Sequence, residues 1–138
     1  MAAPYWPRTV GLVDELERLS QGKYLSLTTF RKTGEGVATP VWVVRDGDHL
    51  YVTTQADSGK VKRLRNNPKV SLAPCDARGK LTGPAVAGTV VLLDTAGSQQ
   101  AQAKVMKRYG MTGRLIGLAN KLRRGSGESI GLEITPES

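Results

Sequence analysis

Six short stretches with the alternation and composition of β-strands follow one another through brief turns, and this order restricts the fold. Asp46-Gly47-Asp48 joins two of them, and an Asp-Gly pair between strands is typical of a tight hairpin. Strands joined by short turns run antiparallel, whereas a doubly wound parallel sheet needs a helix between successive strands. The sequence therefore predicts a mainly β (α+β) fold built on an antiparallel sheet or small barrel. The expected strands are residues 23–30, 37–45, 49–54, 69–76, 84–94 and 128–135.

Helical periodicity marks most of the remaining chain. Ser58 is the expected cap of a short helix that Pro68 ends, because serine favours the N-cap and proline cannot continue a helix. With an N-terminal arm at 1–8, these elements fit one domain of 138 residues. The expected helices are 9–20, 58–66, 97–109 and about 112–124, the last two forming a C-terminal helical segment at 97–124.

Positive charge dominates the composition. Lysine and arginine total 20 against 12 acidic residues, which gives a formal net charge of +8. An excess of this size favours an anionic partner: nucleic acid, a membrane surface, or a phosphorylated or carboxylated small molecule.

Several classes of protein are excluded by residue counts. The chain has one cysteine, Cys75, and one histidine, His49, so an intrachain disulfide, a CxxC motif and a multi-histidine metal site are ruled out, and we expect no metal. Cys75 reads as a small buried hydrophobe and His49 as a surface residue. No pair of carboxylates is spaced for acid–base work, so no catalytic residue is assigned. Apolar runs are too short to span a bilayer and the N-terminus does not resemble a signal peptide, which predicts a soluble cytoplasmic protein.

The stretch Ser58-Gly59-Lys60 is the most informative for function, because there a strand and a polar loop lead into a helix. Unpaired N–H groups at a helix start attract anions, and Gly59 permits close approach to the backbone. Arg63 lies three residues beyond Lys60 on the same face. These residues can converge on one phosphate. A capped surface helix with a solvated basic face explains the same pattern.

Two further features have two interpretations each. Thr39-Pro40-Val41-Trp42-Val43 places a proline inside a strand, which indicates an edge, a bulge or a gap that faces a ligand. The simpler reading is an edge strand with one large core side chain. Residues 95–127 contain seven basic side chains and no acid. That basic amphipathic region fits contact with a membrane or nucleic acid, cover for an anionic ligand, or a helix docked on the barrel with its basic side in water.

These stretches together resemble a known group of proteins. Residues 23–30, Gly36 to Trp42, and Ser58-Gly59-Lys60 through Asn67-Pro68 are similar to the split β-barrel flavin and deazaflavin oxidoreductases related to pyridoxamine 5′-phosphate oxidase. The Thr-Pro-Val-Trp strand and the Ser-Gly-Lys helix start most resemble the branch that uses the deazaflavin coenzyme F420. The resemblance implies a six-stranded antiparallel split barrel with peripheral helices. It also implies a homodimer with cofactor sites at the subunit interface.

The resemblance assigns roles to particular positions. Thr39 to Val43 would lie along the cofactor's ring system, and Thr53 and Thr54 would flank its ribityl chain. Ser58, Gly59 and Lys60 would hold its phosphate, to which helix geometry adds Arg63. Pro74, Cys75 and Arg78 would reach the cofactor of the partner subunit. The oxidase that makes pyridoxal phosphate carries an arginine at the position of Gly59, and this difference argues against pyridoxamine phosphate as the substrate. The cofactor-binding residues expected are Thr39, Pro40, Val41, Trp42, Val43, Thr53, Thr54, Ser58, Gly59, Lys60, Arg63, Pro74, Cys75 and Arg78.

The resulting hypothesis is an F420-dependent oxidoreductase that transfers a hydride between the deazaflavin and a small organic substrate. FMN is the alternative cofactor. The anionic phosphate and glutamate tail of F420 suit the positive charge of the chain, and the hydride chemistry belongs to the cofactor. Two other hypotheses are a cofactor carrier without turnover and a nucleic-acid-binding small barrel. Only 5% of the residues are aromatic, which leaves few side chains on which bases could stack.

Overall fold

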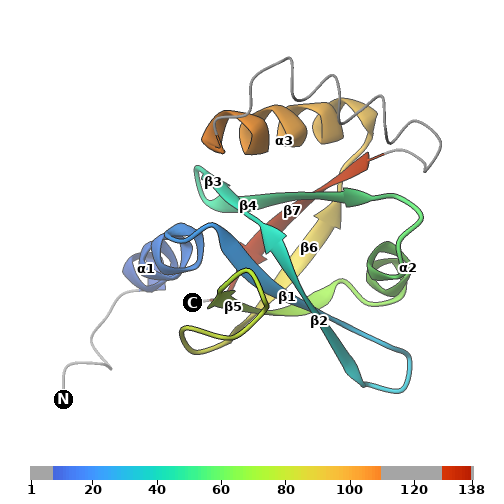
Figure 1. Ribbon diagram of the computed structural model, residues 1–138, viewed down its shortest axis with the longest axis horizontal. Helices are drawn as coiled ribbons and strands as arrows, with labels where there is room; N and C mark the ends of the chain where they lie inside the picture. The colour runs from blue at the N-terminus through green and yellow to red at the C-terminus, as the bar shows by residue number, and fades with distance from the viewer. Residues whose placement is uncertain (1–7, 110–128, 138) are drawn as a thin grey trace.

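The computed structural model describes residues 8–109 and 129–137, which form an antiparallel sheet with helices packed against it (Figure 1). The strands are β1 (Tyr24–Phe30), β2 (Gly36–Trp42), β3 (Val44–Asp46), β4 (His49–Gln55), β5 (Lys69–Cys75), β6 (Val86–Leu92) and β7 (Ser129–Pro136). The helices are α1 (Arg8–Ser20), α2 (Gly59–Asn66) and α3 (Thr95–Arg108). Of the arm expected at 1–8, Arg8 belongs to α1 and the rest lies outside the described residues, as does the second helical piece expected at about 112–124.

The sheet curls into a half-barrel. Its strand order is β2-β1-β5-β6-β7-β4-β3, so two strands adjacent in the chain, β2 and β3, occupy opposite edges. Every pairing is antiparallel, and the tight turn after Asp46 aligns that residue with His49, with Gly47 at a φ of 65°. The expected mainly β, antiparallel split-barrel fold is confirmed.

The number of strands differs from the expectation. The stretch 37–45, read as one strand, is divided at Val43, which gives seven strands rather than six. The N–H of Val43 donates to the Tyr109 hydroxyl at 3.0 Å, and its carbonyl accepts from Arg108 at 2.7 Å. Because these side chains bind the backbone of Val43, the chain leaves β1 as its partner after β2 and pairs with β4 as β3. Pro40 lies in β2, which is an edge strand, and this agrees with the interpretation of the proline as a residue of an edge strand.

The core lies inside the curl of the sheet. Figure 1 shows α1 and α2 at opposite sides of the sheet and α3 along the strand β4. Gly131 allows α3 to approach β7, since a Cβ there would stand 2.9 Å from the Cβ of Ala101. None of the helices in the described ranges is long and apolar enough to cross a membrane. The core residues are Leu16, Leu19, Leu25, Leu27, Val43, Leu50, Val52, Leu64, Val70, Leu72, Val90, Leu132 and Ile134.

Candidate functional site

Ser58 forms the junction between β4 and α2. Its backbone is extended (φ −69°, ψ 156°), and its Oγ accepts a hydrogen bond from the Val61 N–H at 3.3 Å. The expected serine cap is therefore confirmed. Val61 and Leu64 are buried and hold α2 against the sheet, so the helix start is fixed by packing as well as by its cap.

Two cations follow directly after this cap. Lys60 is half-buried, and burial, followed by the charge of Arg63, lowers the pKa of its ammonium. The Nε of Arg63 donates to the Thr29 Oγ1 of β1 at 2.6 Å. None of the ion pairs among the described residues includes Lys60 or Arg63. Two neighbouring cations without a carboxylate form a site that an anion would stabilise.

Gly59 makes room for this arrangement. A Cβ at that position would stand 3.0 Å from Nη1 of Arg63, so the guanidinium lies directly beside the backbone of the first helical turn. The exposed position of Gly59 leaves this part of the helix start open to a ligand.

Thr39 presents a second polar group toward the inside of the barrel. It lies opposite Leu27 in the β1–β2 pairing, and its Oγ1 is buried without a hydrogen-bond partner in the part of the chain that the structure describes. Thr29, the residue that Arg63 contacts, lies opposite Val37. Thr39 is therefore its diagonal neighbour on the same face, at a Cα separation of roughly 7–8 Å. The unpartnered hydroxyl and the cation pair thus belong to one region, within the reach of a single elongated ligand.

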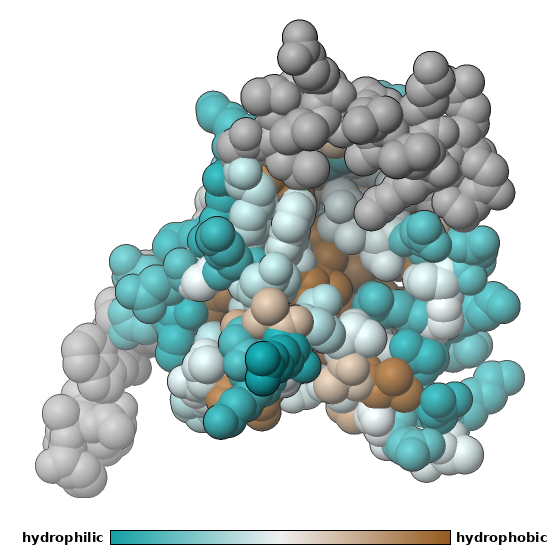
Figure 2. All heavy atoms as spheres, in the orientation of Figure 1, coloured by the Kyte–Doolittle hydropathy of each residue, from teal (hydrophilic) through white to brown (hydrophobic). Residues whose placement is uncertain are grey.

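The other members of the Thr39–Val43 stretch alternate between the two faces of β2. Val41 packs against the core, whereas Pro40 and Trp42 are exposed on the outer face. A flat ligand cannot contact all five side chains on one face, but it can lie along the open edge of the strand. Figure 2 shows hydrophobic residues at the surface between β2 and β4, framed by hydrophilic ones, which suits such a ring.

Arg108 and Tyr109 support this strand although sequence reasoning did not single them out. The Tyr109 ring stacks on Trp42 with the ring centroids 4.7 Å apart. Its hydroxyl lies 2.6 Å from the carbonyl oxygens of Val43 and Lys23. Arg108 also donates to the carbonyls of Gln21 and Gly22, at 3.3 and 2.8 Å. Arg108 ends α3 and Tyr109 is its C-cap, so this part of the expected basic face contacts protein backbone.

Thr53 and Thr54 lie near the end of β4 and point to opposite faces of the sheet. Thr54 lies opposite Ile130 and shares the inner face with Val52. Thr53 lies opposite Gly131 on the outer face, which is the face that α3 covers at β7. Of these two expected ligand residues, only Thr54 faces the interior on the side of the barrel where Thr39 lies.

The structure does not bring Pro74, Cys75 and Arg78 to the start of α2. Pro74 and Cys75 line a cavity beside α1. Arg78 is exposed in the loop after β5, where its N–H donates to Asp76 Oδ1 at 2.9 Å. Their expected contact with a partner subunit's cofactor stays a prediction.

Two further titratable side chains of β4 contact residues of β7. His49 Nδ1 lies 2.9 Å from the Thr135 hydroxyl, and Tyr51 donates to Glu133 at 3.0 Å. Within the described ranges, no three histidine, cysteine, aspartate or glutamate side chains gather as a metal site would require.

Comparison with known proteins identifies both a family and a fold. The sequence profile described as pyridoxamine 5′-phosphate oxidase matches residues 12–138. No curated protein sequence matches the chain. Among solved structures, the conserved hypothetical protein Rv2991 from Mycobacterium tuberculosis has 17% sequence identity and a TM-score of 0.65, over 91% of this chain and 83% of that one.

Two other similar structures carry different printed functions. HutZ, the haem storage protein from Vibrio cholerae, has 16% identity and a TM-score of 0.63, over 96% of this chain and 92% of HutZ. A protein named as an F420 reductase has 18% identity and a TM-score of 0.56, over 88% of this chain and 93% of that one. At these identities the structural similarity establishes a shared fold.

Proposed function

Because this chain belongs to the pyridoxamine 5′-phosphate oxidase family, we propose that it is an F420-dependent oxidoreductase acting on a small organic substrate. The observation that carries the proposal is the half-buried Lys60–Arg63 pair, which has no carboxylate partner among the described residues. The pair lies on the same side of the barrel as the Thr39 hydroxyl, which is also without a partner there. An elongated ligand with an anionic end and a polar body would neutralise the cation pair and give the Thr39 hydroxyl a hydrogen-bond partner. The similarity in fold to an F420 reductase supports the choice of cofactor.

The residues of the α2 start would bind the phosphate. Lys60 supplies a charge whose burial is offset only when an anion is present, and the first-turn N–H groups add hydrogen bonds. Arg63 is held in place by Thr29, so its guanidinium needs little ordering on binding. Ser58 keeps the helix start in its extended-to-helical geometry.

The strand β2 would hold the ring. The Thr39 hydroxyl can donate to, or accept from, a polar ring or ribityl atom, and the strand edge offers backbone groups. Bound deazaflavin would supply hydride transfer at its ring, and the chain would supply orientation and exclusion of water. The described residues need no catalytic dyad for this chemistry.

We further propose that the chain functions as a homodimer. The outer face of β1, β2, β5 and β6 is not covered by a described helix and exposes large apolar side chains. Trp42 and Val91 are 38% and 57% exposed, and Leu81 in the loop between β5 and β6 is 53% exposed. Burial of these residues against a second copy would be favourable. Sedimentation should give twice the chain mass, and a monomer at all concentrations would refute this part.

Fluorescence titration with F420 and with FMN tests the cofactor assignment. Lys60→Ala should weaken F420 binding by about 1–3 kcal/mol, or roughly 5- to 150-fold, because a charged hydrogen-bond partner is lost. Lys62→Ala is the matched control, since Lys62 is exposed on the same helix, and should leave the affinity nearly unchanged.

The outcomes separate the alternatives. Tight FMN binding without an F420 response would assign a flavin enzyme. Stoichiometric F420 binding without reduction of any substrate would indicate a carrier. Equal effects of the two lysine substitutions would remove the phosphate role of Lys60.

A further inference from the structure

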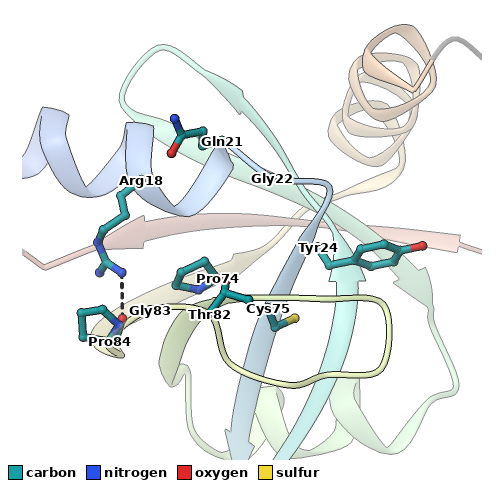
Figure 3. Close-up of a pocket in the computed structure, with 9 residues that line it drawn as sticks. All are labelled: Arg18, Gln21, Gly22, Tyr24, Pro74, Cys75, Thr82, Gly83 and Pro84. Atoms are coloured by element: carbon teal, nitrogen blue, oxygen red, sulfur yellow. Dashed lines mark hydrogen bonds between the residues drawn. The ribbon is translucent and has the colours of Figure 1, made fainter.

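A cavity of about 440 Å³ lies beside the C-terminal end of α1, and Figure 1 shows this helix far from α2. The cavity is bounded by the C-terminal end of α1, the start of β1, the end of β5 and the loop that follows β5. In Figure 3, Arg18 and Pro84 close one side and Tyr24 lies on the other, with Pro74 and Cys75 between them. A volume of this size is in the range of small-molecule sites.

The lining of this cavity is effectively neutral. Among the described residues, Arg18 is its only charged lining residue, and both Nε and Nη2 donate to the Glu15 carboxylate at 3.0 Å. The Nη1 of Arg18 donates to the carbonyl of Pro84 at 2.8 Å, which ties α1 to the loop. Burial, more than the nearby Asp76, raises the pKa of the Cys75 thiol, so the thiol is neutral at physiological pH. Pro74 and Pro84 contribute apolar rings to the lining, and Tyr24 lies at its far edge (Figure 3).

The strand register places this cavity next to the proposed ring site. Tyr24 lies directly opposite Cys75 on β5 and directly opposite Trp42 on β2. These three residues therefore form one row across the outer face of the sheet, with neighbours about 5 Å apart. Trp42 ends the stretch that would hold the cofactor ring along the edge of β2, so this outer-face row connects the cavity to one end of that stretch.

We propose that the cavity between Arg18, Tyr24 and Cys75 binds an uncharged, mainly apolar, planar molecule, and that this molecule is the substrate. The assignment as substrate rests on the proposed function, whereas binding by the cavity does not. A neutral ligand is favoured because the lining offers no uncompensated charge, and moving a carboxylate into it would lose hydration without a partner. The preference of this cavity for an uncharged ligand differs from the preference of the whole chain, whose positive charge favours anions.

The single cysteine gives a direct measure of occupancy. The probes are 2-naphthol, which is uncharged at neutral pH, and 2-naphthoate, an anion with the same ring. Without cofactor, saturating 2-naphthol should slow alkylation of Cys75 by iodoacetamide about tenfold, and 2-naphthoate should bind about tenfold more weakly. Absence of protection, or equal affinity for the two probes, would overturn the proposal.

Glycine substitutions in the cavity wall show where the probe binds. Gly83→Ala should weaken protection, since its Cβ would stand 2.8 Å from Pro74 Cγ and 3.4 Å from Arg18 Nη1, both in the cavity wall. Gly22→Ala is the matched control and should retain protection, because a Cβ at Gly22 meets nothing within 4 Å. If 2-naphthol protects Cys75 equally in Gly83→Ala and Gly22→Ala, the probe binds elsewhere and the proposal is wrong.

Loading with cofactor distinguishes a substrate site from the ring site itself. The protein loaded with F420 or FMN should bind 2-naphthol with unchanged or higher affinity. Competition between them would mean that the cavity receives the ring, which overturns the assignment as substrate site. Failure of either cofactor to bind, with 2-naphthol still protecting Cys75, would instead refute the proposed function and leave the cavity as a binding site.

Discussion

Thr39→Val is expected to change stability and cofactor affinity in opposite directions. Valine has nearly the shape of threonine but lacks the hydroxyl, and the Thr39 Oγ1 is buried with no partner in residues 8–109 and 129–137. A buried hydroxyl without a hydrogen bond costs about 1–3 kcal/mol. The substitution should therefore raise the free energy of unfolding of the cofactor-free protein by about 1 kcal/mol, or the Tm by about 4 °C.

The same substitution removes a hydrogen bond to the bound cofactor. Affinity for F420 should fall by about 1 kcal/mol, or about fivefold. Thermal unfolding without cofactor and fluorescence titration with it measure the two effects. Thr39→Ser is the matched control, because it keeps the hydroxyl and loses the methyl group: it should lower stability and retain affinity. If Thr39→Val lowers stability and leaves affinity unchanged, the hydroxyl has a partner in the protein and no role toward a ligand.

Three further substitutions test separate parts of the account. Tyr109→Phe keeps the aromatic stack on Trp42 but removes the hydrogen bonds to the buried backbone of Val43. It should therefore lower the free energy of unfolding, measured by denaturant titration, by about 1–3 kcal/mol. An unchanged free energy would show that Tyr109 does not hold the break between β2 and β3. Only protonated Lys60 attracts an anion, so F420 affinity should be full below the pKa of Lys60 and fall as the pH rises through it. Because that pKa is lowered, the fall should begin at lower pH than for an exposed lysine, and Lys60→Arg should remove it; a profile that is identical in both proteins would contradict this role. Ser58→Ala removes the helix cap and should lower stability by about 0.5–2 kcal/mol in thermal unfolding, whereas no loss would show that packing alone fixes α2.

Local sequence signals predicted the features that depend on neighbouring residues. The Asp46-Gly47 turn follows from the conformational freedom of glycine, and the Ser58 cap follows from a side chain that bonds three residues away. Pro40 indicated an edge strand because it lacks an N–H, and the sheet order agrees. These signals were sufficient for the fold class and for the position of the α2 start.

Features that depend on contacts distant in sequence could not be predicted in this way. The break at Val43 is made by Tyr109 and Arg108, which lie more than sixty positions away. Arg63 was expected to face a ligand, and its bond to Thr29 of β1 emerged only with the fold. Alternation along β2 also separates Thr39 from Trp42, although the two were expected to line one surface.

The basic stretch near the C-terminus left several interpretations open. Its excess of cations suggested contact with a membrane or nucleic acid, cover for an anionic ligand, or a helix docked on the barrel with its basic side in water. In the described part of that stretch, Lys104 lies 3.6 Å from Asp46, and Arg108 donates to three backbone carbonyls. Composition counts charges, but their partners are determined by the packing of α3 on the barrel.

A crystal structure of the protein soaked with F420 is the most direct test. We expect the phosphate within hydrogen-bonding distance of Lys60 and the first-turn N–H groups of α2, with the ring along the edge of β2 near Thr39. Density for the phosphate at any other place, or no density beside Lys60 at saturating F420, would contradict the account.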